Sequence, residues 1–194
     1  MKKIKHAYFP LTLTFLMLIT AWLPINVEDL LIFDRQRIVN GEWWRILSAH
    51  LIHLSWQHLL MNITGLWIIY WLAKNKTSTT EWFISLVLCS LLIGLALLYI
   101  SDIHWYVGLS GTLHSFLILV AYQAITQSER EGWLILLFVI AKVGWEQWQG
   151  ASPSLEHIIG GNIVIDAHFF GVISGLILAS THHLFVHSRW NNNP

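Results

Sequence analysis

The sequence predicts an all-α membrane protein that crosses the bilayer six times as a single domain over residues 1–194. Hydrophobic residues make up 55% of the chain and charged residues 11%, whereas an average globular domain has about a quarter charged residues. Apolar segments recur along the chain, each of roughly the 17 to 25 residues that a bilayer requires. The expected helices cover residues 7–25, 55–73, 82–101, 110–127, 132–149 and 166–187.

The first apolar segment resembles a signal peptide, because Lys2, Lys3 and Lys5 precede it. A cleavage site of the small-x-small type does not follow, and further apolar segments do. We therefore expect a retained first helix rather than a cleaved leader.

The basic residues predict the orientation of the chain. Both termini of a six-span chain lie on one side, which collects Lys2, Lys3, Lys5, Lys74, Lys76, Arg130 and Arg189. The other side has Arg35, Arg37 and Arg45, all in the long first loop. Since cytoplasmic loops carry the excess of basic residues, we expect both termini in the cytoplasm, the protein in a bacterial inner membrane, and the first loop outside. The net charge of zero gives no indication of a nucleic-acid partner, so the lipid bilayer is the expected surrounding.

With this topology, three groups of polar residues distant in the sequence fall at the same depth. His58 and Asn62 lie in the outer half of the second span, Ser110 at the outer end of the fourth, and His168 near the outer start of the sixth. Chance placement would scatter such residues over different depths. We therefore expect one polar site that opens to the periplasmic side.

Serine proteolysis is the chemistry that fits these residues. A serine hydroxyl is a weak nucleophile until an adjacent base takes its proton, and His168 is the candidate base for Ser110. Gly171 and Gly175 share a helix face with His168, and small residues allow two membrane helices to approach closely. This spacing predicts that His168 can reach Ser110.

His58 and Asn62 are one helical turn apart, and both side chains can donate hydrogen bonds. Together with the backbone N–H of Ser110 at the start of its helix, they could form an oxyanion hole. The alternative is that either side chain holds two helices together.

Four motifs occur in the expected order: EWWR at 42–45, HLSWQHLLMN at 53–62, GLSG at 108–111 and AHFFGVISG at 167–175. On these motifs the sequence resembles the rhomboid intramembrane serine proteases along essentially its whole length. The resemblance implies a six-helix rhomboid bundle with a long external first loop, acting on membrane-anchored protein substrates without a cofactor or a metal.

The resemblance also implies roles for particular residues. Ser110 and His168 would form a catalytic dyad, with His58, Asn62 and Gly108 around the oxyanion. Many rhomboids have a tyrosine four residues after the serine, packed on the catalytic histidine; here that residue is His114. His114 could stack on His168 in the same way, or titrate and compete for the proton.

The compact build and the stretch KVGWEQ at 142–147 look most like the rhombosortase subgroup, which implies substrates with a C-terminal Gly-Gly sorting signal. A general rhomboid protease and a catalytically inactive rhomboid-like binder are the alternatives. Lys142 and Glu146 lie one turn apart inside the fifth span, where ionisable groups are costly. We expect them either to recognise or gate substrate, or to form a structural ion pair.

Two other interpretations of the polar residues are disfavoured. Asp166 is two residues from His168, and residues at that spacing point to different faces of a helix, so we expect a dyad rather than a Ser-His-Asp triad. His50 and His53 could suggest a metal site, but the chain has no HExxH motif.

Overall fold

The computed structural model describes residues 7–73 and 77–191, with the backbone alone from 182 to 191. Lys2, Lys3, Lys5, Lys74 and Lys76, which were counted for the orientation, lie outside the described residues, as does the side chain of Arg189. The long helices are α1 (Tyr8–Thr20), α5 (Trp56–Leu72), α6 (Thr79–Tyr99), α7 (Ser110–Thr126), α8 (Arg130–Gln149) and α10 (Ile165–Asn191).

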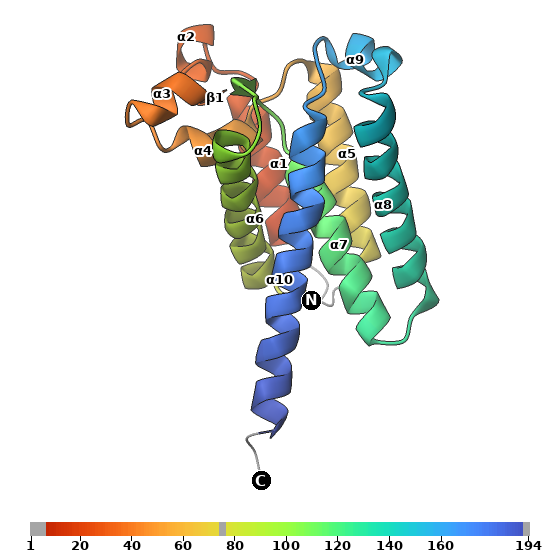
Figure 1. Cartoon of the computed structure of the whole chain (residues 1–194). Coiled ribbons are helices and arrows are strands. Elements are labelled where there is room, and N and C mark those ends of the chain that lie inside the picture. The colour runs from red at the N-terminus through yellow and green to blue at the C-terminus, as the bar shows by residue number, and fades with distance from the viewer. Residues whose placement is uncertain (1–6, 74–76, 192–194) are drawn as a thin grey trace.

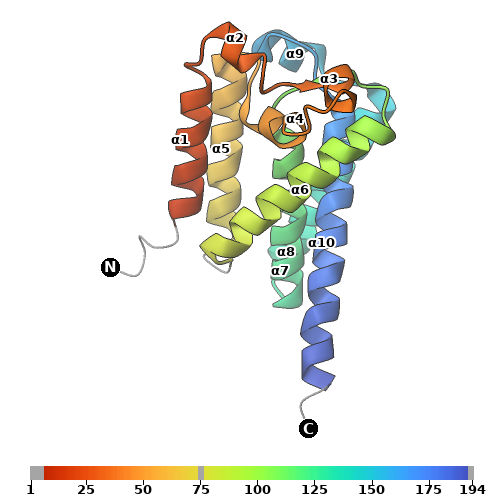
Figure 2. The ribbon, with the colours of Figure 1, turned by 90° about the vertical axis from the view of Figure 1, so that its left-hand side faces the viewer.

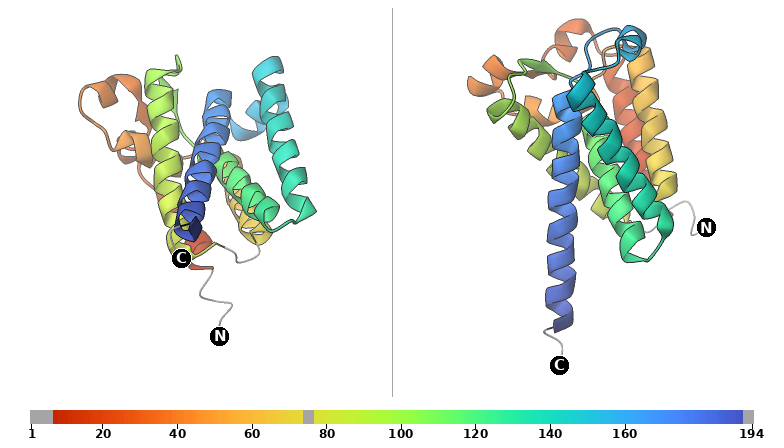
Figure 3. Two further views of the ribbon diagram at one scale, coloured as in Figure 1. Left: turned by 60° about the horizontal axis from the view of Figure 1, so that its bottom comes forward. Right: turned by 45° about the vertical axis from the view of Figure 1, so that its right-hand side comes forward.

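The long helices form a bundle in which successive helices run in opposite directions (Figures 1 and 2). The short elements gather at the upper end of the bundle in Figure 1, and the start of α1 and the end of α10 lie at the lower end (Figure 3). These elements are α2 (Ile25–Glu28), β1 (Phe33–Asp34), α3 (Arg35–Val39), α4 (Arg45–Ser48), the 3-10 turn Ala49–Leu51, β2 (Trp105–Tyr106) and α9 (Pro153–Ile159). The helix α1 therefore begins, and α10 ends, at the end of the bundle opposite the first loop.

Within the described residues, α6 is the helix that is long and apolar enough to cross a membrane unaided. Tyr8–Thr20 and Ile165–Thr181 are apolar but shorter. The helix α1 ends five residues before the expected residue 25. Pro24 keeps the helix from extending to residue 25, because it has no N–H to bond to the Thr20 carbonyl, and the chain turns here into α2.

A second difference is α9, a short helix that the sequence analysis did not predict and that lies between the expected fifth and sixth spans. Pro153 occupies its first turn, where a missing N–H costs nothing, and Gly160 ends it in the left-handed conformation with φ of +80°. The Ser55 hydroxyl donates to the Ile159 carbonyl at 2.7 Å, which ties the end of α9 to the start of α5.

Close contact between α7 and α10 fixes the centre of the bundle. A Cβ added to Gly171 would lie 2.1 Å from the backbone oxygen of Gly111, and one added to Gly175 would lie 2.7 Å from that of Ser115. The two backbones can approach so closely only because these positions carry no side chain. The small-residue face predicted for the sixth span is thus the face that packs on α7.

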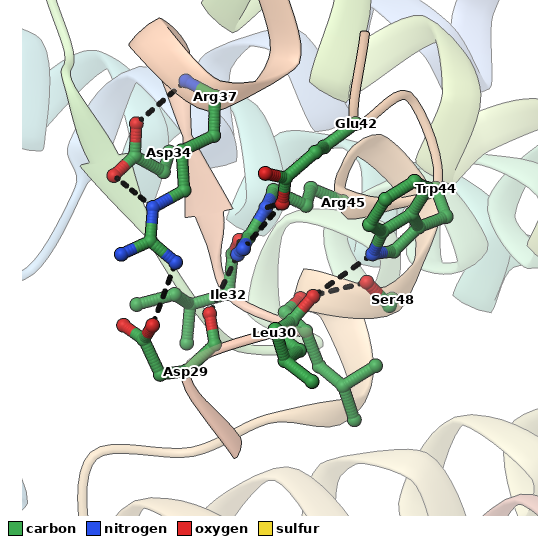
Figure 4. Close-up of polar contacts among 10 residues, drawn as sticks. Asp29, Leu30, Ile32, Asp34, Arg37, Glu42, Trp44, Arg45 and Ser48 are labelled. Carbon is green, nitrogen blue, oxygen red and sulfur yellow. Dashed lines mark hydrogen bonds and ion pairs between the residues drawn. The ribbon is translucent and has the colours of Figure 1, made fainter. Parts of the chain in front are cut away.

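The first loop is held by a group of charged residues that we call the first-loop cluster: Asp29, Asp34, Arg37, Glu42 and Arg45 (Figure 4). Arg45 is fully buried; its Nη1 donates to the carbonyls of Asp29 at 2.6 Å and Ile32 at 2.9 Å, and its Nη2 pairs with Glu42 at 2.7 Å. Nearby, Trp44 Nε1 donates to the Leu30 carbonyl at 2.9 Å. The EWWR motif therefore closes the loop onto its own backbone.

Candidate active site

A cavity of about 240 Å³ lies beside α9, between the starts of α5, α7 and α10 and the last turns of α8. Several predicted site residues line it: His58, Asn62, Ser110, His114, Lys142, Glu146 and His168. The residues between β2 and α7 are buried, so the chain enters the bundle here and α7 begins at the cavity. The fold thus brings together polar residues from four helices.

Ser110 and His168 face each other across the contact between α7 and α10. Ser110 is the first residue of α7, and its Oγ lies 2.9 Å from Nε2 of His168. His168 lies in the first turn of α10 and is 6% exposed. This distance is a normal hydrogen bond between a hydroxyl and an imidazole nitrogen.

Glu146 contacts the other ring nitrogen of His168. Its Oε2 lies 2.9 Å from His168 Nδ1, and its Oε1 pairs with Lys142 Nζ at 2.8 Å. The ion pair between Lys142 and Glu146 that the spacing suggested is present, and it lies against His168. The sequence analysis did not assign this contact to Glu146, because the i,i+4 spacing does not reveal which side of α8 faces α10.

His114 completes a group that we call the site cluster: Ser110, His114, Lys142, Glu146 and His168. The imidazole of His114 stacks on that of His168, with ring centroids 4.3 Å apart and planes at 25°. Its Nδ1 lies 2.7 Å from the Ser110 carbonyl oxygen and its Nε2 lies 2.9 Å from Lys142 Nζ. His114 therefore takes the stacked position expected of the family's tyrosine.

His58 and Asn62 present donors to the cavity. The backbone N–H of Leu54 donates to His58 Nδ1 at 3.3 Å, so the ring hydrogen lies on Nε2. Asn62 uses one amide hydrogen on the His58 carbonyl at 3.0 Å, and its second amide hydrogen has no acceptor among the described residues. Both side chains are buried and line the cavity. The hydrogen bond of Asn62 stays within α5, so this bond does not link two helices.

Gly108 makes room for His58. Its φ of +119° lies in the region that favours glycine, and a Cβ added there would lie 2.8 Å from His58 Cε1. Its own N–H donates to the Ala49 carbonyl at 3.0 Å. Gly108 therefore contributes space and a backbone turn rather than a donor to the cavity.

Asp166 lies apart from the catalytic pair. Its carboxylate accepts from the Ser101 hydroxyl. The different-face argument from the sequence is thus confirmed for this residue. Asp166 instead attaches the start of α10 to the segment that follows α6.

His114, Glu146 and His168 are also the residue types that bind metal ions, and their ligand atoms lie within 4.8 Å of one another. The ammonium of Lys142 lies within 3.2 Å of a polar atom of each of the three. A cation would have to displace this ammonium to bind there. The donor set therefore suits the lysine better than a metal.

This helical bundle, with a serine and a histidine paired in a cavity at one end, matches a known class of membrane protein. The rhomboid domain matches residues 40–185, so the chain belongs to the rhomboid family. The family implies an integral membrane protein.

The chain is similar to three named relatives. It is 27% identical to YdcA of Bacillus subtilis (strain 168), which is named as a rhomboid protease, over 73% of this chain and 68% of that protein. It is 25% identical to the rhomboid protease GluP of the same strain, over 80% of this chain and 30% of GluP. It is 23% identical to the rhomboid protease GlpG of Salmonella newport (strain SL254), over 73% of this chain. The chain spans 49% of that GlpG, about half its length.

Proposed function

We propose that this protein is an intramembrane serine endopeptidase, with Ser110 as nucleophile and His168 as its base. The observation that carries the proposal is the 2.9 Å contact between Ser110 Oγ and His168 Nε2 in a cavity within the bundle. The named rhomboid proteases among its relatives support the same activity. Serine hydrolysis needs no metal or organic cofactor, and the proposal includes none.

The reaction follows from the positions of the donors. Ser110 Oγ attacks the scissile carbonyl while its proton passes to His168 Nε2, and the carbonyl oxygen becomes an oxyanion. In this proposal the Nε2–H of His58 and the second amide hydrogen of Asn62 stabilise that charge, as do the N–H groups in the first turn of α7. His168 then protonates the leaving amine, and water hydrolyses the acyl-enzyme by the same route.

We place the protein in a bacterial inner membrane, with both termini in the cytoplasm and the cavity open to the periplasmic side. The first loop, α9 and the cavity share one end of the bundle, and the start of α1 and the end of α10 share the other (Figure 1). The excess of basic residues that the sequence assigns to the side of both termini supports this orientation.

The substrate in this proposal is a membrane-anchored protein with a C-terminal Gly-Gly sorting signal. A helix must open before a carbonyl in it can be attacked, and glycine weakens a helix by about 1 kcal/mol relative to alanine. A Gly-Gly pair at the outer end of an apolar helix would present an extended segment to Ser110. The KVGWEQ stretch supports this narrower substrate class.

Cleavage of a reporter tests both the proposed protease activity and the proposed Gly-Gly specificity. The reporter has a periplasmic domain, Gly-Gly, an apolar helix and a basic tail, and its control replaces Gly-Gly with Leu-Leu. We expect release near Gly-Gly and little release from the control. Equal cleavage of both would leave a general rhomboid protease and contradict the sorting specificity.

Active-site variants separate a protease from an inactive binder. Ser110→Ala and His168→Ala should each remove nearly all turnover, and the double variant should be hardly worse, because the two residues act as a unit. The readout is reporter cleavage by purified protein with equal folded fractions. Wild-type cleavage by Ser110→Ala would refute the protease proposal, whereas binding of the reporter without cleavage by the wild type would favour the binder.

A further inference from the structure

The position of the hydrogen on His168 is determined by its neighbours. Glu146 Oε2 lies 2.9 Å from Nδ1, and an ionised carboxylate can only accept a hydrogen bond. The hydrogen of the neutral ring therefore lies on Nδ1 and is donated to Glu146. Nε2 then carries a lone pair, which faces the Ser110 hydroxyl at 2.9 Å.

The opposite tautomer fits this environment less well. With the hydrogen on Nε2, the lone pair of Nδ1 would face a carboxylate oxygen at 2.9 Å. Its one donor would be the Lys142 ammonium at 3.2 Å, which already bonds at shorter distances to Glu146 and His114. The Nε2–H group would point at Ser110 Oγ and could not accept its proton. The contact with Glu146 therefore favours the tautomer of His168 that can act as a base over the tautomer that cannot.

Lys142 and His114 form further hydrogen bonds that are consistent with this arrangement of donors and acceptors. His114 Nδ1 donates to the Ser110 carbonyl at 2.7 Å, which leaves its Nε2 to accept from the Lys142 ammonium at 2.9 Å. The ammonium also donates to Glu146 Oε1 at 2.8 Å. A cation beside the carboxylate favours its ionised form in a largely buried site.

We propose that Glu146 is a positioning residue that makes the active site a Ser110–His168–Glu146 triad, with Lys142 holding the carboxylate. This inference rests on the proposed protease function and adds a third member that the dyad lacks. Glu146 fixes the Nδ1–H tautomer before reaction. It also stabilises the imidazolium that forms once Nε2 has taken the serine proton, while the carboxylate itself stays unprotonated.

Two variants of Glu146 separate positioning from a structural ion pair. In Glu146→Gln the amide NH₂ can turn to His168 while its oxygen keeps the bond from Lys142, which favours the wrong tautomer. Loss of the orienting carboxylate in a serine protease triad lowers kcat by about 10⁴, so we expect a loss of about 10³ to 10⁴ with KM little changed. Glu146→Asp keeps the carboxylate and should retain at least about tenfold more turnover than the amide.

Exchange of the two charges gives the sharpest comparison. Lys142→Glu with Glu146→Lys preserves an i,i+4 pair in α8 but places an ammonium opposite His168 Nδ1. We expect thermal stability in detergent close to that of the wild type and turnover as low as in Glu146→Gln. Glu81→Gln is the matched control, because Glu81 caps α6 at the other end of the bundle and glutamine is compatible with a capping box.

The outcomes distinguish this inference from the proposed function. An inactive Ser110→Ala together with a Glu146→Gln or exchange variant within tenfold of wild-type kcat would overturn the triad and leave the protease proposal intact. An active Ser110→Ala would instead overturn the protease proposal itself. If Glu146→Gln folds poorly, two measurements decide the question. One is kcat per folded molecule of the exchange variant, and the other is whether Glu146→Asp has a higher kcat per folded molecule than Glu146→Gln.

Discussion

The first-loop cluster and the site cluster use similar charged side chains in different ways. In the first-loop cluster the buried guanidinium of Arg45 donates to loop carbonyls and to a carboxylate one turn away (Figure 4). In the site cluster the side chains bond mainly to one another, across α7, α8 and α10, beside a cavity. The first arrangement closes a segment of backbone, and the second holds a hydroxyl against a base.

The difference lies in what remains available for a ligand. Around the cavity, Asn62 has an amide hydrogen without an acceptor among the described residues. Arg45 instead directs its Nε to Glu42 and its Nη1 to the carbonyls of Asp29 and Ile32. A charged group with its bonds satisfied stabilises a fold, while donors left open beside a nucleophile can act on a substrate. We therefore expect substitutions in the two regions to affect different measured quantities.

Outside the Ser110–His168–Glu146 group, the largest effect is expected at Asn62. Asn62→Ala removes a proposed oxyanion donor, a loss that typically lowers kcat by about 100-fold to 1000-fold. Reaction of Ser110 with a fluorophosphonate probe should remain detectable. Thr64→Ala, an exposed position in the same helix, is the control and should retain turnover. If Asn62→Ala misfolds but keeps its activity per folded molecule, the residue has a structural role instead.

An effect on stability is expected in the first loop. Arg45→Met leaves the carbonyls of Asp29 and Ile32 without their donor and Glu42 without its partner. Loss of such charged hydrogen bonds should lower the free energy of unfolding by about 2 to 3 kcal/mol. Arg37→Met, at a residue with a 42% exposed side chain, should cost less than Arg45→Met, because solvent screens its ion pair with Asp29.

Both arginine variants should keep their turnover per folded molecule within about threefold of the wild type, a change of less than 1 kcal/mol in the barrier. Denaturant unfolding in detergent measures the first quantity and reporter cleavage the second. A large fall in turnover of a stably folded Arg45→Met protein would contradict the claim that the first-loop cluster affects stability alone.

The smallest effect concerns pH and His50, which lies between α4 and α5 in the first loop. Burial lowers the pKa of His50 to about 4, against the opposing effect of its bonds to the backbone at Ser90 and Gly108. The unfolded state therefore binds more protons than the folded state between pH 6.5 and 4, and stability falls as the pH is lowered through this range. From pH 7 to pH 5.5 the loss should be about 1 kcal/mol from His50.

His53 adds to the same slope, because burial and the nearby His58 lower its pKa to about 3. Replacement of His50 by Gln should reduce the pH dependence of unfolding without abolishing it. Denaturant titrations at several pH values measure the slope. An unchanged slope in His50→Gln would show that His50 does not remain neutral in the folded protein.

The sequence predicted much of the site because the relevant residues carry local signals. The small face of Gly171 and Gly175 predicted which side of α10 would pack on α7, and hence that His168 could reach Ser110. The two-residue spacing correctly removed Asp166 from the site.

The remaining features depend on tertiary geometry. The contact between Glu146 and His168 requires the rotation of α8 about its axis, and the low contrast between faces of an apolar helix leaves that rotation undetermined. The helix α9 is only 7 residues long, too short for a clear hydrophobic period. The early end of α1 was missed because the apolar run continues to Leu23, although Pro24 marked it.

The most direct test of the account is to map the site of covalent modification by a fluorophosphonate probe in the purified protein. The probe reacts with serines whose hydroxyl is activated by a base, so mass spectrometry of the labelled peptides reports the nucleophile directly. We predict a single adduct on Ser110 in the wild type and in Glu81→Gln, and none in Ser110→Ala or His168→Ala. An adduct on another serine that abolishes cleavage, or reporter cleavage that persists in a protein whose Ser110 is completely labelled, would contradict the assignment of Ser110 and His168 as the catalytic pair.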